Sequence, residues 1–212
     1  MENTGSYRII RSPGTGEITE KKSRFIANVF PVSSVKEAEE QIAVIQKKYW
    51  DARHNCYAFV IGSDMGTTRC SDNGEPSGTA GKPILEVIKG AGLTDTLIVV
   101  TRYFGGVLLG TGGLVRAYTQ AAQAGLSSCS IGEMVYGSTY HLTADYSLIN
   151  NIQYYLGTQN IPLKNETYTD KVEYDITLKA DDTDRILSGL TAKTDGRILA
   201  EKTGEGFYPF DA

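Results

Sequence analysis

Hydrophobic and polar positions alternate most strictly over residues 171–180, in the segment KVEYDITLKA. One face of this segment carries Val172, Tyr174, Ile176, Leu178 and Ala180, and the other carries mainly charged side chains. Successive side chains of a strand point to opposite faces, so the pattern predicts a strand with one buried face. Residues 135–144 alternate in the same way and predict a second strand, with Tyr136, Tyr140, Leu142 and Ala144 on its apolar face.

Two segments of helical periodicity lie around these strands. The first begins at Asp145, a candidate N-cap, and its apolar stripe is formed by Leu148, Ile152, Tyr155 and Leu156. The second begins at Asp182 or Thr183, and its apolar stripe is formed by Ile186, Leu187 and Leu190. With short strands at 163–169 and from Arg197 onward, the order is β-α-β-β-α-β, which predicts a ferredoxin-like domain over residues 134–212.

The clearest helix of the first half is predicted over residues 34–50. Ser34 and Glu37 have the spacing of a capping box. Apolar side chains recur at helical spacing at Val35, Ala38, Ile42, Ile45 and Tyr49.

The rest of the first half mixes strands with two further helices. Strands are predicted at 7–11, 17–19, 24–32, 55–61 and 97–101, a loop at 70–81, and helices at 83–91 and 112–127. The chain is therefore expected to be of the α+β class, with one domain over residues 1–133 and a second over residues 134–212.

Composition narrows the class of protein. With 212 residues, 41% hydrophobic and 22% charged, the chain is long enough to bury a core without disulfides. Its three cysteines lack framework spacing, its first residues do not form a signal peptide, and its longest aliphatic run is 97–100. We therefore expect a reduced, soluble, cytoplasmic protein with no membrane partner.

Charge is distributed unevenly between the two predicted domains. Residues 1–133 hold 14 Lys and Arg against 13 Asp and Glu, whereas residues 134–212 hold 7 against 12. This asymmetry is consistent with two domains. Only the first, which is not net acidic, is expected to bind an RNA backbone. The simpler interpretation is that the second domain is acidic only for solvation.

A glycine-rich stretch, TRYFGGVLLGTGGLVRAYTQ at 101–120, joins the strand at 97–101 to the last helix of the first half. A strand, a glycine turn and a helix N-terminus can bind an anion, which makes Gly110, Gly112 and Gly113 candidates. A P-loop would require a lysine after the last glycine, and a dinucleotide fingerprint would require a small residue where Val115 stands. The alternative is that the glycines only permit positive φ angles and close helix–strand contact.

A second loop, SDNGEPSGTAGKP at 71–83, is small and polar. Asp72, Glu75, Ser77, Thr79 and Lys82 are able to hydrogen-bond a ligand there. The spacing does not match the nucleophile elbow G-x-S-x-G. An exposed surface loop with no ligand is the alternative.

On a strand His54 and Cys56 would face the same way, and Cys70 follows further along the chain. These three side chains have the chemistry of metal ligands, but the usual zinc spacings are absent. His54 is kept as a loop candidate, and neither a metal nor another cofactor is expected.

Six cations lie near the two loops: Lys21, Lys22, Arg24, Lys82, Arg102 and Arg116. Arg102 precedes Tyr103 and Phe104, and arginine beside aromatic rings is typical of nucleic-acid and phosphate recognition. Arg116 lies in the first turns of a predicted helix, where a cation is unfavourable unless an anion balances it. The alternative is intramolecular pairing of Arg102 or Arg116 with Asp72, Glu75 or Glu86.

Long motifs in the first half resemble the IMPACT/YigZ family. RCSDNGEPSGTAGKPILE and VVTRYFGGVLLGTGGLVRAY are similar to its two signature blocks, and DARHNCYAFVIG is similar to a third. The resemblance implies an N-terminal domain with the fold of a small-subunit ribosomal protein's second domain, elongation factor G domain IV and GHMP kinases. It also implies a ferredoxin-like C-terminal domain similar to elongation factor G domain V. Eukaryotic relatives regulate translation initiation by binding a ribosome-associated activator of an initiation-factor kinase.

These observations favour a monomeric, non-enzymatic binding protein of the translation apparatus. It would contact RNA, the ribosome or a translation factor through the basic glycine-rich loops, with no catalytic residue. The alternative is a nucleotide- or phosphometabolite-binding enzyme of the GHMP-kinase-like superfamily at residues 110–116, with Asp72 or Glu75 as its base or metal ligand. A third hypothesis is a protein–protein adaptor that uses the acidic second domain.

Overall fold

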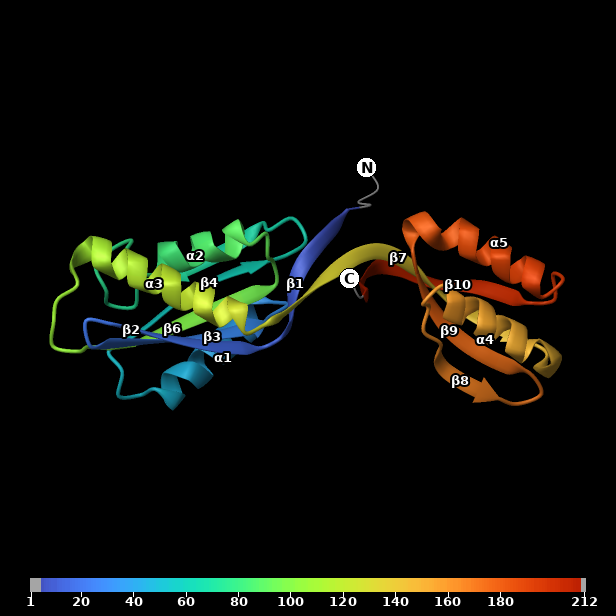
Figure 1. Cartoon of the computed structure of the whole chain (residues 1–212), viewed down its shortest axis with the longest axis horizontal. Helices are drawn as coiled ribbons and strands as arrows, with labels where there is room; N and C mark the ends of the chain where they lie inside the picture. The colour runs from blue at the N-terminus through green and yellow to red at the C-terminus, as the bar shows by residue number, and fades with distance from the viewer. Residues whose placement is uncertain (1–4, 211–212) are drawn as a thin grey trace. The chain divides into compact units, whose positions relative to one another are not determined.

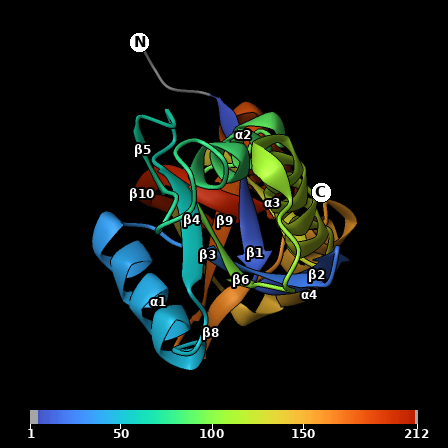
Figure 2. The same cartoon turned by 90° about the vertical axis from the view of Figure 1, so that its left-hand side faces the viewer.

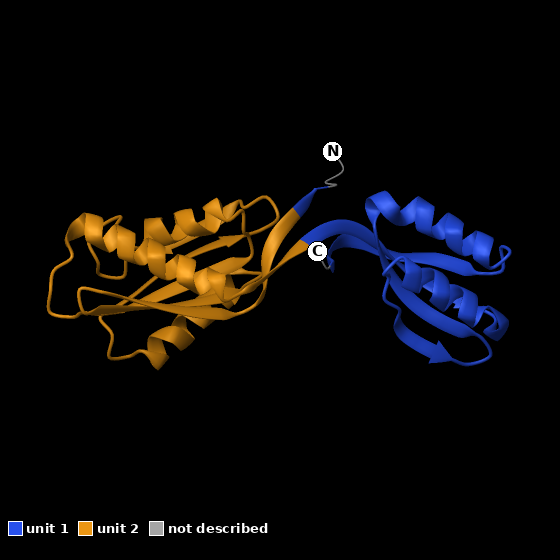
Figure 3. Cartoon of the chain, in the orientation of Figure 1, with its two compact units in different colours: residues 1–6, 134–210 blue, residues 7–133, 211–212 orange. Residues whose placement is uncertain are grey.

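A computed structural model describes residues 5–210 of the chain. The chain divides into two compact units, Tyr7–Glu133 (unit 2) and a second that is mainly Met134–Phe210 (unit 1), shown in different colours in Figure 3. Each unit combines a β-sheet with packed helices, so the α+β class predicted from the sequence is confirmed.

Unit 2 is built on a five-stranded sheet in the order β2-β3-β6-β4-β5. Its strands are β2 (Gly14–Glu20), β3 (Ser23–Pro31), β4 (His54–Ile61), β5 (Thr67–Ser71) and β6 (Thr96–Tyr103). All four pairings are antiparallel. A tight turn at Lys21 and Lys22, both with positive φ, joins β2 to β3.

Helices cover both faces of this sheet. α2 (Gly81–Gly90) and α3 (Gly110–Ser127) lie on one face, and α1 (Val35–Lys48) lies on the other (Figures 1 and 2). Ile98 and Val100 of β6 belong to the core beneath α2 and α3, whereas Leu97 and Val99 belong to the core beneath α1. The aliphatic run at 97–100 therefore marks a strand that is buried on both faces.

The capping box of α1 forms only in part. The Glu37 N–H donates to Ser34 Oγ over 3.2 Å, as predicted. The Glu37 carboxylate does not return to Ser34 but accepts hydrogen bonds from the backbone N–H and the hydroxyl of Ser33. The helix begins at Val35 and ends at Lys48, which makes it shorter than the predicted 34–50.

The segment predicted as a loop at 70–81 is shorter in the structure. Cys70 and Ser71 end the edge strand β5, and Gly81 begins α2. β5 was missed because its residues, TTRCS, are polar and mostly exposed, which leaves no alternation of apolar positions.

Unit 1 has the predicted element order β-α-β-β-α-β. Its elements are β7 (Ser130–Ala144), α4 (Ile149–Thr158), β8 (Lys164–Tyr168), β9 (Val172–Lys179), α5 (Thr183–Lys193) and β10 (Leu199–Phe210). The strand order is β10-β7-β9-β8, and β1 (Ser6–Ser12) also pairs with β7. The alternating residues of β7 and β9 form one core with Ile152 and Leu156 of α4 and with Ile186 and Leu190 of α5.

The two predicted aspartate caps of unit 1 form only in part, since Asp182 is the N-cap residue of α5 and Asp145 is that of the 3₁₀ turn before α4. The single turns η1 (Tyr146–Leu148) and η2 (Ala180–Asp182) precede α4 and α5, so the chain enters each helix through a tighter 3₁₀ turn. The side chains of Asp145 and Asp182 make no capping hydrogen bond. Asp182 instead accepts a hydrogen bond from Arg185, and the Thr183 hydroxyl donates back to the Lys179 carbonyl.

Candidate functional site

The connection between β6 and α3, residues 104–109, is shaped by close backbone contact. A Cβ at Gly105 would lie 2.0 Å from the carbonyl carbon of Lys22, so only glycine fits against the β2–β3 turn. The Gly105 N–H donates to Ser23 Oγ over 3.2 Å, and Gly106 has a φ of 86°. The predicted positive φ is therefore confirmed at Gly106, while the close contact at Gly105 is with the β2–β3 turn and not between a helix and a strand.

α3 begins without a side-chain cap. Its N-cap residue is Leu109, and Gly110 takes a φ of 70° as the first helical residue. The first N–H groups of a helix have no intrahelical acceptor, and together with the helix dipole they favour a negative charge. Gly110 and Gly112 are exposed and Gly113 is half-buried, so the start of the helix is accessible.

The two glycine-rich loops meet at a cavity of about 420 Å³, which we call the loop cavity. It is lined by Arg53, His54, Glu75, Pro76, Arg102, Phe104, Leu108, Leu109, Gly110, Thr111 and Leu114. These residues come from the start of β4, the loop at 72–80, the end of β6, the connection at 104–109 and the first turns of α3. The volume is within the range of about 300–1,000 Å³ that is usual for small-ligand pockets.

Arg102 and Glu75 form a buried ion pair in this cavity. Arg102 Nη1 lies 2.7 Å from Glu75 Oε1, and the two side chains are only 7% and 4% exposed. The Tyr118 hydroxyl donates to the same carboxylate oxygen over 2.9 Å. Of the two interpretations of Arg102, the structure therefore supports intramolecular pairing with Glu75. Arg102 does not present a free cation to solvent.

The Arg102 guanidinium also lies near two aromatic rings. Its central carbon is 5.4 Å from the ring centre of Phe25 and 5.6 Å from that of Phe104. Arg102 Nε is buried and has no hydrogen-bond partner among the described residues. The ion pair therefore leaves the Nε–H group of Arg102 without an acceptor. Buried polar groups without a hydrogen-bond partner are uncommon.

Cys56 and Tyr118 lie beneath the ion pair. Cys56 Sγ is 2.9 Å from the Asp72 carbonyl oxygen and 3.3 Å from the Tyr118 hydroxyl. Burial raises the pKa of the Cys56 thiol to about 12, so it stays protonated near neutral pH and is a poor nucleophile. Burial also raises the pKa of Tyr118, with Cys56 and Glu75 adding to the effect, so its hydroxyl remains a donor.

Asp72 holds the loop at 72–80 together. Its Oδ1 accepts hydrogen bonds from the N–H groups of Ala80 and Gly81, and its Oδ2 accepts one from Gly78. Burial by itself would raise the pKa of Asp72, but the bonds from Gly78, Gly81 and Ala80 outweigh it and lower that pKa. Because the N-cap residue of α2 is Ala80, Asp72 supplies the cap from outside the helix.

The other candidates of this loop differ in what they offer a ligand. The buried Thr79 donates its hydroxyl to the Pro76 carbonyl over 2.6 Å, whereas Ser77 is exposed. His54 is half-buried, and its Nδ1 lies 2.9 Å from the Asn73 carbonyl oxygen. A carbonyl only accepts, so Nδ1 carries the proton and Nε2 of the neutral ring is an acceptor.

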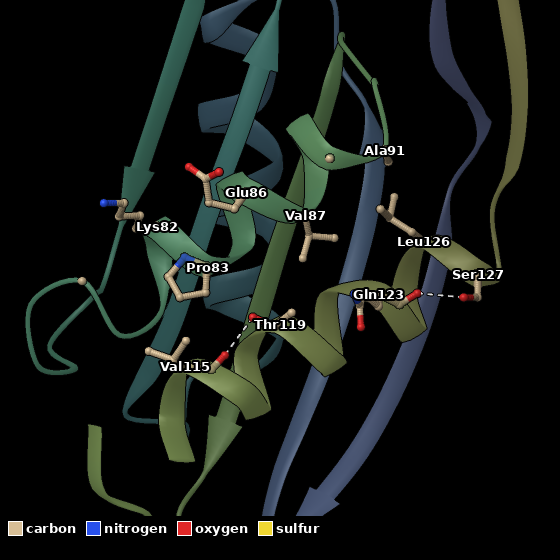
Figure 4. A pocket seen from close by; sticks show the side chains of 12 residues that line it. Lys82, Pro83, Glu86, Val87, Ala91, Val115, Thr119, Gln123, Leu126 and Ser127 are labelled. Carbon is tan, nitrogen blue, oxygen red and sulfur yellow. Dashed lines mark hydrogen bonds between the residues drawn. The ribbon is translucent and has the colours of Figure 1, made fainter. Parts of the chain in front are cut away.

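The remaining predicted cations do not form one cluster. Lys21 and Lys22 are exposed in the turn beside Gly105, and Arg24 forms an exposed ion pair with Glu17 at 2.6 Å. Arg116 is exposed on α3 and forms no ion pair with any described residue. Lys82 lines a separate groove of about 750 Å³ between α2 and α3, together with Val115 and Thr119 (Figure 4).

Apart from Phe104, which the sequence singled out only as a neighbour of Arg102, sequence reasoning missed the apolar side chains of the cavity. Phe104 is 51% exposed and Leu108 is 83% exposed, although both residues are apolar. Their signal was present in FGGVLLG, where apolar residues lie between glycines and have no strand or helix period. Tyr118 and Arg53 were also missed, because a tyrosine in an apolar helix and a lone arginine carry no pattern of their own.

No group of three or more metal-binding side chains gathers within residues 5–210. Cys70 is exposed on β5 opposite Ala58, apart from the buried Cys56, so the set of His54, Cys56 and Cys70 is not brought together. In the same part of the chain no helix is long and apolar enough to span a bilayer.

Two family models match the chain. The model described as the Impact N-terminal domain matches residues 21–126, which include every residue of the loop cavity. A domain of unknown function, DUF1949, matches residues 142–197. The matches fall on unit 2 and unit 1 respectively.

Curated relatives match over most of the chain. The IMPACT family member YvyE of Bacillus subtilis is 41% identical over 192 residues, covering 91% of this chain and 88% of its own length. YigZ of Escherichia coli is 36% identical over 165 residues, which is 77% of this chain and 81% of YigZ. The human Protein IMPACT is 33% identical over 98 residues, which cover 44% of this chain and 30% of that protein.

A solved structure has the same fold. It is described only as the crystal structure of a hypothetical protein, is 33% identical and has a TM-score of 0.61 to this chain. The likeness covers 92% of this chain and 96% of the other. Sequence and structure therefore relate both units of this chain to the same group of proteins.

Proposed function

Because the chain belongs to the IMPACT family, we propose that it is a cytoplasmic, non-catalytic binding protein of the translation apparatus that contacts RNA through unit 2. The observation that carries this proposal is the exposed loop at 104–109 beside the uncapped start of α3. Phe104, Val107 and Leu108 are three large exposed apolar side chains within this one short loop, and a group of exposed apolar side chains marks an interaction surface.

The surroundings of the loop suit RNA. Lys21 and Lys22 lie in the turn that packs against Gly105, and Arg53 and the start of α3 border the loop cavity. Aromatic side chains stack on bases that have left a helix, while cations and helix N-termini bind the phosphates. This combination supports RNA as the partner, either free or within the ribosome.

The geometry around Asp72 supports binding rather than catalysis. A general base needs a free lone pair within reach of the proton it removes. Both carboxylate oxygens of Asp72 already accept backbone N–H groups, whereas Glu75 keeps Oε2 free while its Oε1 accepts from Arg102 and Tyr118. The alternative, a nucleotide- or phosphometabolite-binding enzyme, keeps one supporting observation, namely that the loop cavity is of small-ligand size.

The proposal is tested by ribosome co-sedimentation and by filter binding of single-stranded RNA to the full chain at increasing salt. We expect binding to weaken steeply with salt, because each phosphate contact to a single strand contributes a slope of about −0.7 in log K against log salt. The double variant Lys21→Ala/Lys22→Ala should bind several-fold more weakly and reduce the slope by about 1.4.

The matched control is Lys47→Ala/Lys48→Ala, which removes two exposed neighbouring lysines from the last turn of α1, on the opposite face of the sheet. This control should leave both affinity and slope unchanged. An absence of ribosome and RNA association at every salt concentration would overturn the proposal. Turnover of a nucleotide or phosphometabolite by the full chain would favour the enzyme instead.

A further inference from the structure

The floor of the loop cavity carries a donor and an acceptor without full partners. Arg102 Nε is buried and unpartnered in a side chain that is 7% exposed. Both hydrogen bonds to Glu75 end on Oε1, so Oε2 is available in a side chain that is 4% exposed. Buried polar groups are costly to leave unmet, so a ligand that offers an acceptor beside a donor would satisfy the floor.

The walls of the cavity are apolar and include one aromatic ring. Phe104, Leu108, Leu109 and Leu114 line it, and Phe104 is 51% exposed although it lies beside the Arg102 guanidinium. An exposed ring next to a guanidinium is a platform for a flat, polarisable group. The ligand is therefore planar as well as polar at one edge.

The rim of the cavity favours a negative charge. Gly110 and Thr111 are exposed at the uncapped start of α3, and both line the cavity. Arg53, also exposed, borders the same space. Backbone N–H groups at a helix start, with the dipole behind them, bind phosphate readily.

From these three features we propose that the loop cavity binds one nucleoside monophosphate unit. The base lies against Phe104 with its hydrogen-bonding edge toward Glu75 and Arg102, and the phosphate lies at the start of α3. Base edges present donors beside acceptors, which matches the floor. A simple anion fits less well, because Glu75 neutralises Arg102.

This inference rests on the proposed function in one respect, since RNA supplies the unit as an unstacked nucleotide. A free nucleotide presents the same chemistry, and the experiment separates the two sources. The full chain is titrated with AMP, GMP, CMP and UMP, with ribose 5-phosphate and inorganic phosphate as probes that lack a base. Binding is followed by calorimetry and by chemical-shift changes in the backbone N–H groups of residues 104–114.

We expect at least one nucleotide to bind at least tenfold more tightly than ribose 5-phosphate. Phe104→Ala should weaken that binding about tenfold, in line with loss of one stacking contact. Trp50→Ala is the matched control, because Trp50 is 82% exposed and lies outside the cavity, and it should change nothing. Phe104 is half exposed and Trp50 largely exposed, so neither substitution removes a core side chain.

A second variant tests the position of the phosphate. Thr111→Asp places a negative charge in the first turn of α3, where it favours the helix but repels a phosphate. It should weaken nucleotide binding several-fold and leave binding of the corresponding nucleoside unchanged. Equal weakening of both, or of neither, would contradict the assignment of the helix start.

The source is decided with a single-stranded RNA octamer and the same octamer made abasic at its four central positions. Nucleotide binding together with weaker binding of the abasic octamer supports the inference, with RNA as the source. Nucleotide binding without RNA binding supports the cavity as a free-nucleotide site and overturns the proposed function. Equal RNA binding with and without bases, and no nucleotide binding, overturns the inference alone. Binding of neither nucleotide nor RNA overturns both.

Discussion

Asp72 determines the geometry of one side of the loop cavity through its two carboxylate oxygens. They accept three backbone N–H groups, from Gly78, Ala80 and Gly81, and so tie the loop at 72–80 to the start of α2. Glu75 lies between these contacts, and its position opposite Arg102 depends on the loop being held. Asp72 is thus a positioning residue, although its type and setting in the sequence suggest a ligand contact.

Asp72→Asn replaces one accepting oxygen by a donor and is expected to lower the free energy of unfolding by about 0.5–2 kcal/mol, the usual range for a lost cap. Its effect depends on pH. The folded protein lowers the pKa of Asp72 below its ordinary value of 3.8, so its contribution is complete above that value and is lost as the pH falls through the folded pKa. Denaturant unfolding should therefore show the variant and the parent converging below about pH 4.

Asp64→Asn is the matched control for this comparison, because Asp64 accepts one backbone N–H, from Gly66, in an exposed turn. Its effect should be clearly smaller than that of Asp72→Asn. A difference between Asp72→Asn and the parent that stayed constant down to pH 2 would show that the charge of Asp72 does not stabilise the fold.

The helix α3 and its preceding loop combine two different uses of glycine. Gly105 is required because the Lys22 backbone occupies the space of a side chain. Gly112, inside the first turn of α3, has only the flexible end of Arg116 within 4 Å. The same sequence motif therefore contains one position fixed by sterics and one that is open.

Gly105→Ala is expected to destabilise the protein, because its Cβ would clash with backbone and not with a movable side chain. Gly112→Ala is expected to raise the free energy of unfolding by about 0.5–1 kcal/mol, since alanine loses less backbone entropy in a helix. Thermal or denaturant unfolding of the two variants measures both signs. A stabilised Gly105→Ala protein would contradict the close contact with the β2–β3 turn.

At the scale of the whole molecule, the two units bury separate cores. The core of unit 2 between the sheet and α2 and α3 includes Ile84, while the core of unit 1 includes Ile152, and the two sets of buried residues share no member. Each unit thus has its own hydrophobic cluster, as expected for separately folding domains.

Ile152→Ala and Ile84→Ala form a matched pair, since both side chains are 0% exposed and each substitution should cost about 2–5 kcal/mol. Hydrogen exchange followed by mass spectrometry should show faster exchange within residues 134–210 for Ile152→Ala. It should show faster exchange within residues 7–133 for Ile84→Ala. Equal acceleration in both units for either variant would show that they unfold as one cooperative body.

The sequence by itself determined the element order of unit 1 and the main helices of both units. Strict alternation at 171–180 and helical spacing at 34–50 are local patterns, and burial of one face is enough to explain them. Elements without such a pattern were missed, notably β5, in which exposed polar side chains carry no period. The 3₁₀ turns that precede α4 and α5 also lack a sequence signal.

Only the tertiary structure decided what the candidate side chains do. The alternatives for Arg102, a free phosphate contact or a partner of Glu75, are equal in sequence because 27 positions separate the two residues. Strand pairing and the packing of α3 bring them to 2.7 Å in a space from which water is largely excluded. A buried arginine requires a carboxylate partner in such a setting. Arg102, which the sequence suggested as a surface contact, therefore lies in the floor of the loop cavity, paired with Glu75.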